Sequence, residues 1–433
     1  MSRIALSDIC SYRTESGPID PLTYISTESI LPNRAGVTKA SSIPTTGKAK
    51  LFRRGDTLVS NIRPYFKKIW QATEDGCCSA DVLVFKPSAC HADYLYWLLS
   101  SDAFFDYMVA TSKGTKMPRG DKAAIMQYES VDMSIEDQRG IAMILNPIRG
   151  LIELNQQIND YLEEMGQLFL AGYYENCSSD CKLAEIMALG SGFAFKSDTY
   201  TDVGRYKVLT IKNVQDGNVD CSTSNRVDKI PSKMKKYCKL KLGDVVLSLT
   251  GNVGRVGIVA ERNCLLNQRV AVLQPKNPKL LAALYFLFRD KTFQNEMIGI
   301  ARGTAQANLS PLETVQLSVP YNETGLLELS SVLTLIFDLI LRNKIESAKL
   351  SDLRDTLLPK LISGEIDVSK VDVTQLNNHL SNQTGLGNPL FRVMKGSSSL
   401  YFGFSPHVYS AMGVISQPSG KSGFAVESDS SSK

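Results

Sequence analysis

Apolar residues recur at alternating steps of three and four along residues 141–169. The positions on this seam are Ile141, Ile144, Ile148, Leu151, Asn155, Ile158, Leu162, Met165 and Phe169, and eight of the nine are apolar. Such spacing is typical of a helix that lies along a second helix. The pattern therefore predicts one long helix that has a partner helix.

A second seam of the same kind lies 188 residues further along the chain. It passes through Leu329, Val332, Ile336, Leu339, Asn343, Glu346, Leu350, Leu353 and Leu357, with its Asn at the same step as Asn155. An Asn on such a seam lowers stability but fixes register or partner choice. Because the seams match, we predict that the two helices pair with each other; two ordinary amphipathic helices in separate cores are the alternative. The residues predicted to make this pairing are Ile148, Leu151, Asn155, Leu162, Ile336, Leu339, Asn343 and Leu350.

The same offset relates segments outside the two helices. Residues 55–60 recur at 243–248, residues 82–87 at 270–275, and an apolar helical stretch near 94–108 at 280–297. A period this long indicates a duplicated domain rather than a solenoid. Each half combines short β-like runs, a Gly-Asp turn, a helix and then a seam helix, so the prediction is an α+β fold with an internal repeat.

Two parts of the chain depart from this pattern. Asn146-Pro147 falls inside the first seam, and Pro in a helix interior is unfavourable whereas Pro at a first helical position is tolerated. We therefore predict a short helix over residues 136–145 and a kink or restart at Pro147. After about Val373 the pattern is lost, and residues 374–433 are rich in Ser, Gly and Asn, which predicts a mostly disordered tail.

Composition narrows the class of protein. The 433 residues are 43% hydrophobic and 21% charged, which suits two or three soluble domains. The net charge of +4 permits a nucleic-acid partner without implying one. The longest apolar run, residues 280–288, is shorter than the ~20 residues of a membrane span, and charges interrupt the N-terminus, so neither a membrane partner nor a signal sequence is expected. Nine cysteines without framework spacing indicate a cytoplasmic location, and three scattered histidines predict no metal site.

The motifs of the common catalytic sites are missing from the sequence. Gly420-Lys421-Ser422 resembles half of a phosphate loop, but position 415 is Ile where that loop needs Gly. No glycine fingerprint opens a helix, no Asn-Pro-Pro-aromatic motif of amino-methyltransferases occurs, and no serine triad can be assembled. We predict no catalytic residue and no cofactor in this chain, and a duplicated chain of this kind favours a binding scaffold.

Loops of the second repeat carry side chains suited to nucleic acid. Residues 229–241 hold six lysines and Tyr237, which suits a phosphate backbone, although a solvated loop is the alternative. Three further segments at 248–255, 267–269 and 302–308 carry the Asn, Gln and Arg side chains that read base edges. At 267–269 a strand edge with local hydrogen bonds is an equal alternative. The candidate DNA-binding residues are Lys233, Lys235, Lys236, Asn252, Arg255, Gln268, Arg269, Arg302, Thr304, Gln306 and Asn308.

Corresponding places in the first repeat are also basic. Residues 61–68 occupy the position of the 249–256 loop, and residues 113–122 occupy that of 302–311. The candidates there are Arg63, Tyr65, Lys67, Lys68, Lys116 and Arg119. The two sets match in position and differ in sequence, which is what a reader of two different half-sites needs.

The sequence resembles the specificity subunit of type I restriction-modification systems over about residues 1–370. The segments that carry this resemblance are GFAFKS at 192–197, LGDVVLS at 242–248 with GNVG at 251–254, GTAQANLS at 303–310 and LLPKLISGEI at 357–366. YISTESILPN at 24–33 is similar to one class of the family's recognition domains.

The resemblance implies two globular target-recognition domains joined by two long antiparallel coiled-coil helices, with a pseudo-twofold internal repeat. Target-recognition domains are expected at 1–135 and 179–325, spacer helices at 136–178 and 326–373, and a tail at 374–433. Each domain would read one half of a split double-stranded DNA site, and the seam would span about 43 Å between them.

The resemblance also implies the partners. Two methyltransferase (modification) subunits would carry S-adenosylmethionine and methylate adenine, and restriction translocase-nuclease subunits would use ATP and magnesium. The chain itself would be the non-catalytic specificity subunit. The alternatives are a stand-alone DNA-binding regulator, which would bind DNA by itself, and a protein-interaction scaffold, whose DNA affinity would show little salt dependence.

Overall fold

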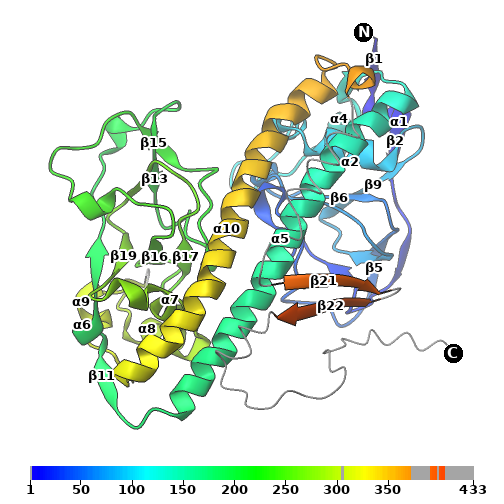
Figure 1. Ribbon diagram of the computed structural model, residues 1–433. Coiled ribbons are helices and arrows are strands. Elements are labelled where there is room, and N and C mark those ends of the chain that lie inside the picture. The colour runs from blue at the N-terminus through cyan, green and yellow to red at the C-terminus, as the bar shows by residue number, and fades with distance from the viewer. Residues whose placement is uncertain (1, 304–306, 372–390, 397–398, 405–433) are drawn as a thin grey trace. The chain divides into compact units, whose positions relative to one another are not determined.

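A computed structural model describes residues 2–303, 307–371, 391–396 and 399–404 of the chain. Its contacts divide the chain into two compact units, Met1–Val368 and Ser369–Lys433. The first unit contains two β-rich segments, each followed by a long helix (Figure 1). We call residues 2–134 the first β-rich segment and residues 176–322 the second.

The first β-rich segment is built around a four-stranded sheet with the order β2-β9-β6-β7. These strands are Cys10–Tyr12, Val82–Pro87, Thr57–Ser60 and Ile69–Gln71. A second four-stranded sheet has the order β3-β5-β8-β4, with strands Ser16–Pro18, Lys48–Phe52, Gly76–Cys78 and Tyr24–Ile25. Strand β1 (Arg3–Ala5) pairs antiparallel with β10 (Glu129–Val131). The helices are α1 (Leu6–Ile9), α2 (Ala92–Ser100), α3 (Asp102–Ala110) and α4 (Lys122–Met126), with 3-10 turns η1 (Pro32–Arg34) and η2 (Pro64–Phe66). Leu58, Val84 and Phe52 are fully buried in its core.

The second β-rich segment repeats this plan with a larger sheet. Its five-stranded sheet has the order β12-β19-β16-β17-β14, with strands Met187–Ser191, Val270–Pro275, Val245–Ser248, Val256–Ile258 and Gly217–Asn218. A three-stranded sheet, β15-β13-β18, comprises Asn225–Val227, Tyr206–Leu209 and Cys264–Leu266. Strand β11 (Asp180–Lys182) pairs antiparallel with β20 (Ser318–Pro320). The helices are α6 (Leu183–Ile186), α7 (Leu281–Arg289), α8 (Lys291–Ile300) and α9 (Pro311–Thr314), with 3-10 turns η3 (Ser197–Thr199), η4 (Lys236–Cys238) and η5 (Pro278–Leu280).

Matching contacts show that the two β-rich segments are copies of one unit. In the first, residue Arg119 forms β-bridges with Ile62 and Lys113; in the second, Asn308 forms them with Thr250 and Arg302. All three positions are related by 188 or 189 residues. The preceding serines agree as well, because Ser60 Oγ donates to the Ile62 carbonyl and Ser248 Oγ to the Thr250 carbonyl. The predicted internal repeat is therefore present in the structure.

Helices α5 (Ile135–Glu175) and α10 (Glu323–Ile362) contact each other along their length and run antiparallel (Figure 1). Asn155 Nδ2 donates to Ser347 Oγ over 3.3 Å and to Glu346 Oε2 over 3.1 Å. Asn343 Nδ2 donates to Asn159 Oδ1 over 2.9 Å. Residues 155 and 159 of α5 correspond, at the 188-residue offset, to residues 343 and 347 of α10. The contacts 155–347 and 343–159 are therefore equivalent, and the helix pair has a local twofold relation. The two seam asparagines do not meet; each contacts the other helix one turn away.

The apolar seam residues lie in this contact. Ile148, Leu162, Ile336 and Leu350 are buried, and Leu151 and Leu339 are half-buried. Helix α10 is long and apolar enough to cross a membrane, as judged by length and composition only. The search for uninterrupted apolar runs in the sequence did not reveal this stretch. Its Leu333, Ile336 and Ile340 are buried in the structure, so we interpret this stretch as a core helix packed against α5 and α7.

The predicted interruption at Pro147 is wrong, because α5 continues through Pro147 over 41 residues. Pro147 cannot donate to the carbonyl of Met143. Met143 lies on the exposed side of the helix with 53% of its surface accessible, where water satisfies such a carbonyl. Asn146 is held by tertiary contacts instead, since its Oδ1 accepts from Trp97 Nε1 at 2.8 Å and its Nδ2 donates to Asp93 at 2.8 Å. Packing of α2 on α5 thus overrides the local preference.

After α10 the described chain has a 3-10 turn, η6 (Val368–Lys370). The second unit contains an antiparallel pair of strands, β21 (Phe391–Gly396) and β22 (Ser399–Phe404). These two strands lie within the tail that the sequence predicts to be mostly disordered. The rest of the predicted tail, residues 374–390, 397–398 and 405–433, lies outside the described residues.

Candidate nucleic-acid interface

Three loops of the second repeat, which are distant from one another in sequence, come together at one edge of its larger sheet. Thr250 is at their centre: its Oγ1 donates to Asn308 Oδ1 over 2.8 Å, and Arg269 Nη1 donates to Thr250 Oγ1 over 3.4 Å. The backbone of Gly251 also donates to the Ala307 carbonyl over 3.2 Å. The structure therefore joins the 248–255, 267–269 and 302–308 segments that the sequence singled out.

An open, mainly polar cleft lies between these loops. It is lined by Ser191, Leu249, Thr250, Gln268, Arg269, Asn308, Leu309, Ser310 and Pro311. Gln268 and Arg269 are exposed there, whereas the backbone of this segment makes local bonds: Arg269 N donates to Asn267 Oδ1 over 3.5 Å, and Val270 N donates to the Asn267 carbonyl over 2.9 Å. The local-hydrogen-bond interpretation of residues 267–269 is thus correct for the backbone. The Gln268 side chain is exposed at the cleft, and a ligand of Arg269 would have to replace its long bond to Thr250.

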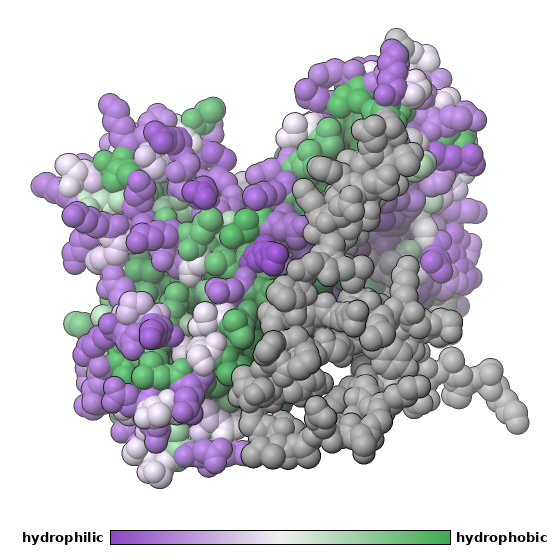
Figure 2. All heavy atoms as spheres, in the orientation of Figure 1, coloured by the Kyte–Doolittle hydropathy of each residue, from purple (hydrophilic) through white to green (hydrophobic). Residues whose placement is uncertain are grey.

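The lysine-rich loop borders the same cleft. Tyr237 Oη donates to the carbonyl of Ser191, a residue of the cleft lining, over 3.0 Å. Lys233, Lys235 and Lys236 are exposed, and Lys235 Nζ lies 5.6 Å from the Tyr237 ring centroid. Figure 2 shows hydrophilic residues over much of the visible face of the second β-rich segment. The loop therefore adds positive charge to one rim of a polar cleft.

The remaining candidates of the second repeat divide into three groups. Asn252 is exposed. Arg255 is half-buried and donates from Nη1 to Gln215 Oε1 over 2.8 Å, and exposed Arg302 forms an ion pair with Glu313. These two guanidinium groups have partners within the chain, which a DNA contact would have to replace. Thr304 and Gln306 lie outside the described residues.

The first repeat joins its two candidate loops in the same way. Arg63 N donates to the Pro118 carbonyl over 2.8 Å, and Arg63 itself is exposed with φ +51°. Tyr65 is 49% exposed and its ring lies 4.7 Å from that of Phe66. Lys116 is exposed, and Arg119 forms an ion pair with Asp81 over 3.2 Å. Four of the six candidates of this repeat thus lie at the surface of joined loops.

The geometry argues against the other two candidates, Lys67 and Lys68. Lys67 Nζ forms an ion pair with Asp102 over 2.7 Å, which Arg34 also contacts. Lys68 Nζ donates to the Thr27 carbonyl over 2.7 Å, and burial lowers the pKa of Lys68 despite the opposing effect of Glu28. Both ammonium groups have partners inside the segment, which a DNA contact would have to replace.

Sequence reasoning missed the residues that organise the cleft. Thr250 and Tyr237 lay within the segments of interest, but they were not among the candidates, and Ser191 had no distinguishing feature. A signal for Thr250 does exist: it follows Ser248 by two residues, as Ile62 follows Ser60 in the first repeat. Among the described residues no group of three or more His, Cys, Asp or Glu side chains could hold a metal ion.

The first β-rich segment is fastened to α5 by a mixed polar and aromatic contact. Asp93 accepts from Asn146 and from Gln71 Nε2, the latter over 2.9 Å. Arg149 Nη1 donates to Gln71 Oε1 over 2.9 Å, and its guanidinium lies 4.6 Å from the Tyr96 ring centroid. This contact fixes α2 and β7 against the N-terminal half of α5.

The fold and the interface together define a class of protein: a duplicated α+β chain with a long helix after each copy and a polar, partly cationic surface on each copy. Such surfaces are typical of proteins that bind nucleic acid.

Comparison with known proteins finds similarity to one family of DNA-recognition proteins. Residues 178–332 match the family described as the type I restriction modification DNA specificity domain. The chain is 23% identical to the type I restriction enzyme HindI specificity subunit of Haemophilus influenzae, over 80% of this chain and 94% of that protein. It is 26% identical to the MjaVIII specificity subunit of Methanocaldococcus jannaschii, over 65% of this chain and 72% of that protein. The resemblance to type I specificity subunits is thereby confirmed.

Solved structures of similar proteins include the S subunit of a type I restriction-modification system from M. genitalium. It shares 16% identity, covers 83% of this chain and 96% of its own, and superposes with a TM-score of 0.46. The HsdS subunit from Thermoanaerobacter tengcongensis shares 18% identity, covers 84% of this chain and 97% of its own, and gives a TM-score of 0.32.

Proposed function

We propose that this chain is the sequence-specific DNA-binding subunit of a type I restriction-modification complex. The two β-rich segments act as target-recognition domains, and each reads one half of a bipartite site. The observation that carries the proposal is the shared bridge pattern at Arg119 and Asn308, which presents different side chains on the same frame. A reader of two unlike half-sites needs one architecture with two surface chemistries.

The side chains divide into positioning and reading groups. Lys233, Lys235 and Lys236 stand on a rim and contact phosphates, since ammonium groups act there as point charges. Gln268, Arg269 and Asn308 face the cleft and read base edges, because amide and guanidinium groups can bond bidentately to adenine and guanine. In the first repeat Arg63, Tyr65, Lys116 and Arg119 take the equivalent positions.

The paired helices serve as spacer and as the docking surface for two methyltransferase subunits. Leu154, Tyr161 and Leu168 lie seven residues apart on α5 and are 46%, 66% and 74% exposed. Such a stripe suits an apolar helix face of a partner. The positions related by 188 residues on α10 are Arg342, Lys349 and Thr356, which are also exposed. The two docking faces therefore differ in chemistry.

The chemical steps belong to the partners in this proposal. Methyltransferase subunits hold S-adenosylmethionine and modify adenine, and translocase-nuclease subunits use ATP and magnesium. This chain supplies no catalytic group, and it works in the cytoplasm, where the DNA lies.

The direct test is co-purification of the chain with the modification subunit, followed by an assay for S-adenosylmethionine-dependent methyl transfer to DNA. A stable complex that methylates adenine supports the proposal. A well-folded chain that forms no complex and supports no methylation contradicts it and favours the stand-alone binder.

Variants of that complex test the division of roles. Replacing Lys233 and Lys236 by Ala should weaken binding to all DNA alike and reduce the slope of log affinity against log salt by about two. Replacing Arg269 or Asn308 by Ala should relax one half-site only, at about 1–3 kcal/mol for the bases concerned. Lys276→Ala, which removes an exposed charge at the end of β19 away from Arg269, is the matched control. Equal effects of both sets on all DNA would contradict this division.

A further inference from the structure

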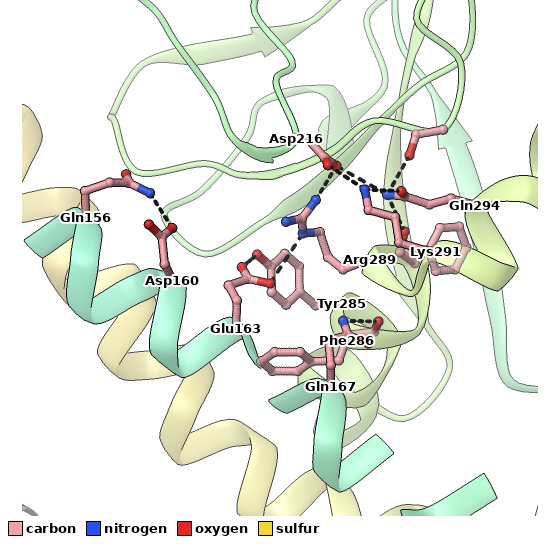
Figure 3. Close-up of polar contacts among 12 residues, drawn as sticks. Gln156, Asp160, Glu163, Gln167, Asp216, Tyr285, Phe286, Arg289, Lys291 and Gln294 are labelled. Atoms are coloured by element: carbon pink, nitrogen blue, oxygen red, sulfur yellow. Dashed lines mark hydrogen bonds and ion pairs between the residues drawn. The ribbon is translucent and has the colours of Figure 1, made fainter. Parts of the chain in front are cut away.

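We propose that Asp216 and Gln294 are positioning residues that hold the 251–255 loop in place relative to α5, through a continuous chain of polar contacts that begins at Glu163. The inference deepens the proposed function and rests on it for its meaning, since that loop carries candidate base-reading side chains. Figure 3 shows the chain of contacts.

The first link joins α5 to α7. Glu163 contacts the hydroxyl of Tyr285 and accepts from Arg289 Nε over 3.4 Å. The side chains of Glu163 and Arg289 are only 17% and 15% exposed, and Tyr285 is fully buried. Charged groups so well shielded from water are held in a fixed geometry by their partners. This link therefore sets the position of α7 on the helix.

The second link joins α7 to the turn before β14. Arg289 forms an ion pair with Asp216, and Lys291 Nζ contacts the same carboxylate over 2.9 Å. Burial alone would raise the pKa of Asp216, but Arg289 and Lys291 together hold that pKa below its usual value. Gly217 has φ +82°, which a larger residue adopts only with strain, and its Cβ position lies 3.2 Å from the Arg289 guanidinium, so a side chain there would press on that group.

The third link reaches the loop. Gln294 on α8 is 7% exposed, and its Nε2 donates to Asp216 over 3.3 Å and to the Gly254 carbonyl over 3.4 Å. Beside it, Gln215 accepts from Arg255 Nη1 over 2.8 Å. The loop is thus held at the Gly254 carbonyl by Gln294 and at the Arg255 side chain by Gln215. An unbroken route of contacts runs from Glu163 to Gly254.

The first repeat offers a built-in comparison. Its contact with α5 uses Asn146, Asp93, Gln71 and the stacking of Arg149 on Tyr96 in place of a buried guanidinium–carboxylate link. A change in the Glu163–Gln294 route should therefore affect the second loop and leave the 61–68 loop unchanged.

Hydrogen–deuterium exchange on the free, full-length chain tests the inference without DNA. In Gln294→Ala, Asp216→Ala and Glu163→Ala, amides of residues 250–256 should exchange up to about tenfold faster, the effect of one lost hydrogen bond. Asp216→Glu should restore part of the protection, because it keeps the carboxylate. Gln156→Ala is the control, since exposed Gln156 donates to Asp160, four residues on in α5, over 2.7 Å in the same region (Figure 3).

Two results would overturn the inference: unchanged exchange at 250–256 in Gln294→Ala, or an equal rise at 61–68, which would indicate general destabilisation. In the methyltransferase complex, the same variants should lower discrimination at one half-site only. If the wild-type complex binds no DNA while the exchange pattern is as expected, the proposed function fails and the positioning role stands.

Discussion

Gly166 lies where α5 packs tightly against Phe286 of α7. A Cβ built there would lie 2.1 Å from Cε1 of Phe286, which no side-chain contact tolerates. The glycine thus permits the short separation at which Glu163 reaches Tyr285 and Arg289.

Gly166→Ala should destabilise the chain by about 1–3 kcal/mol, because α7 must move away from α5. Urea unfolding measures this change. Gly150→Ala on the same helix is the matched control: no atom lies within 4 Å of its Cβ position, so it should stabilise by up to about 1 kcal/mol. A loss at Gly166 no larger than at Gly150 would contradict the steric account, and Phe286→Leu should partly rescue Gly166→Ala.

Burial of Lys344 on α10 makes the stability of the folded chain depend on pH, and the sign of this dependence follows from the lowered pKa. Burial lowers the pKa of Lys344 from 10.5 to about 8, against the opposing effects of Glu163 and Asp160 and with a further decrease from Arg289. Below pH 8 both folded and unfolded chains hold the proton, and the folded state bears the cost of a buried charge. Between pH 8 and 10.5 only the unfolded chain keeps it, so this group makes stability rise with pH.

Lys344→Met should therefore be more stable than wild type by roughly 1–3 kcal/mol at pH 7. That advantage should shrink as the pH rises from 8 to 10.5. Chemical denaturation of both chains at pH 7 and pH 9.5 measures it, and the difference between them cancels the titration of other groups. An advantage that grows with pH would show that the sign is wrong.

At this scale the sequence predicted residue types better than residue roles. Six cationic and amide segments could be identified, and the structure joins two of them in the first repeat and three in the second. That Lys67 and Lys68 turn inward depends on Asp102 and the Thr27 carbonyl, which are 35 and 41 residues distant in the chain. The residues next to Lys67 and Lys68 in the sequence do not predict such contacts.

Among the elements, the long helices were the most predictable. Their seams contain the buried residues of the α5–α10 contact, and their matching asparagines contact the opposite helix. The interruption expected at Pro147 was wrong because Trp97 and Asp93, which hold Asn146 in the helix, belong to another element. Local propensity favoured a break, and tertiary packing prevented it.

Pro147→Ala should raise the stability of the chain by about 1–3 kcal/mol, because Ala restores the bond to the Met143 carbonyl and removes the ring clash. Thermal unfolding, followed by the circular-dichroism signal of the helices, measures this gain. Pro311→Ala is the control: Pro311 stands in the first turn of α9, where Pro is tolerated, so no gain is expected. A loss of stability in Pro147→Ala would mean that the proline is favourable in this helix.

For the whole molecule, duplication explains both the architecture and the proposed function. Helix α5 has 41 residues and is thus about 60 Å long, longer than the seam alone indicated. An antiparallel pair of such helices holds the two β-rich segments, which the proposed function makes recognition units, at a constant separation. The account therefore predicts two half-sites with an invariant gap between them.

The duplication itself was visible in the sequence, since both copies keep the same offset. The joining of three loops around Thr250 was not, because β-bridges between residues some 60 positions apart follow from the sheet that carries them. The partners entered only through resemblance to a family, as no residue of this chain identifies them.

The most direct test of the central claim is a genome-wide map of methylated adenines in cells that express this chain with its modification subunit. The account predicts one bipartite motif, two short fixed half-sites with a constant gap, and a change in only one half when Arg269 is replaced by Ala. Methylation that is independent of this chain, or a single continuous motif, would contradict it.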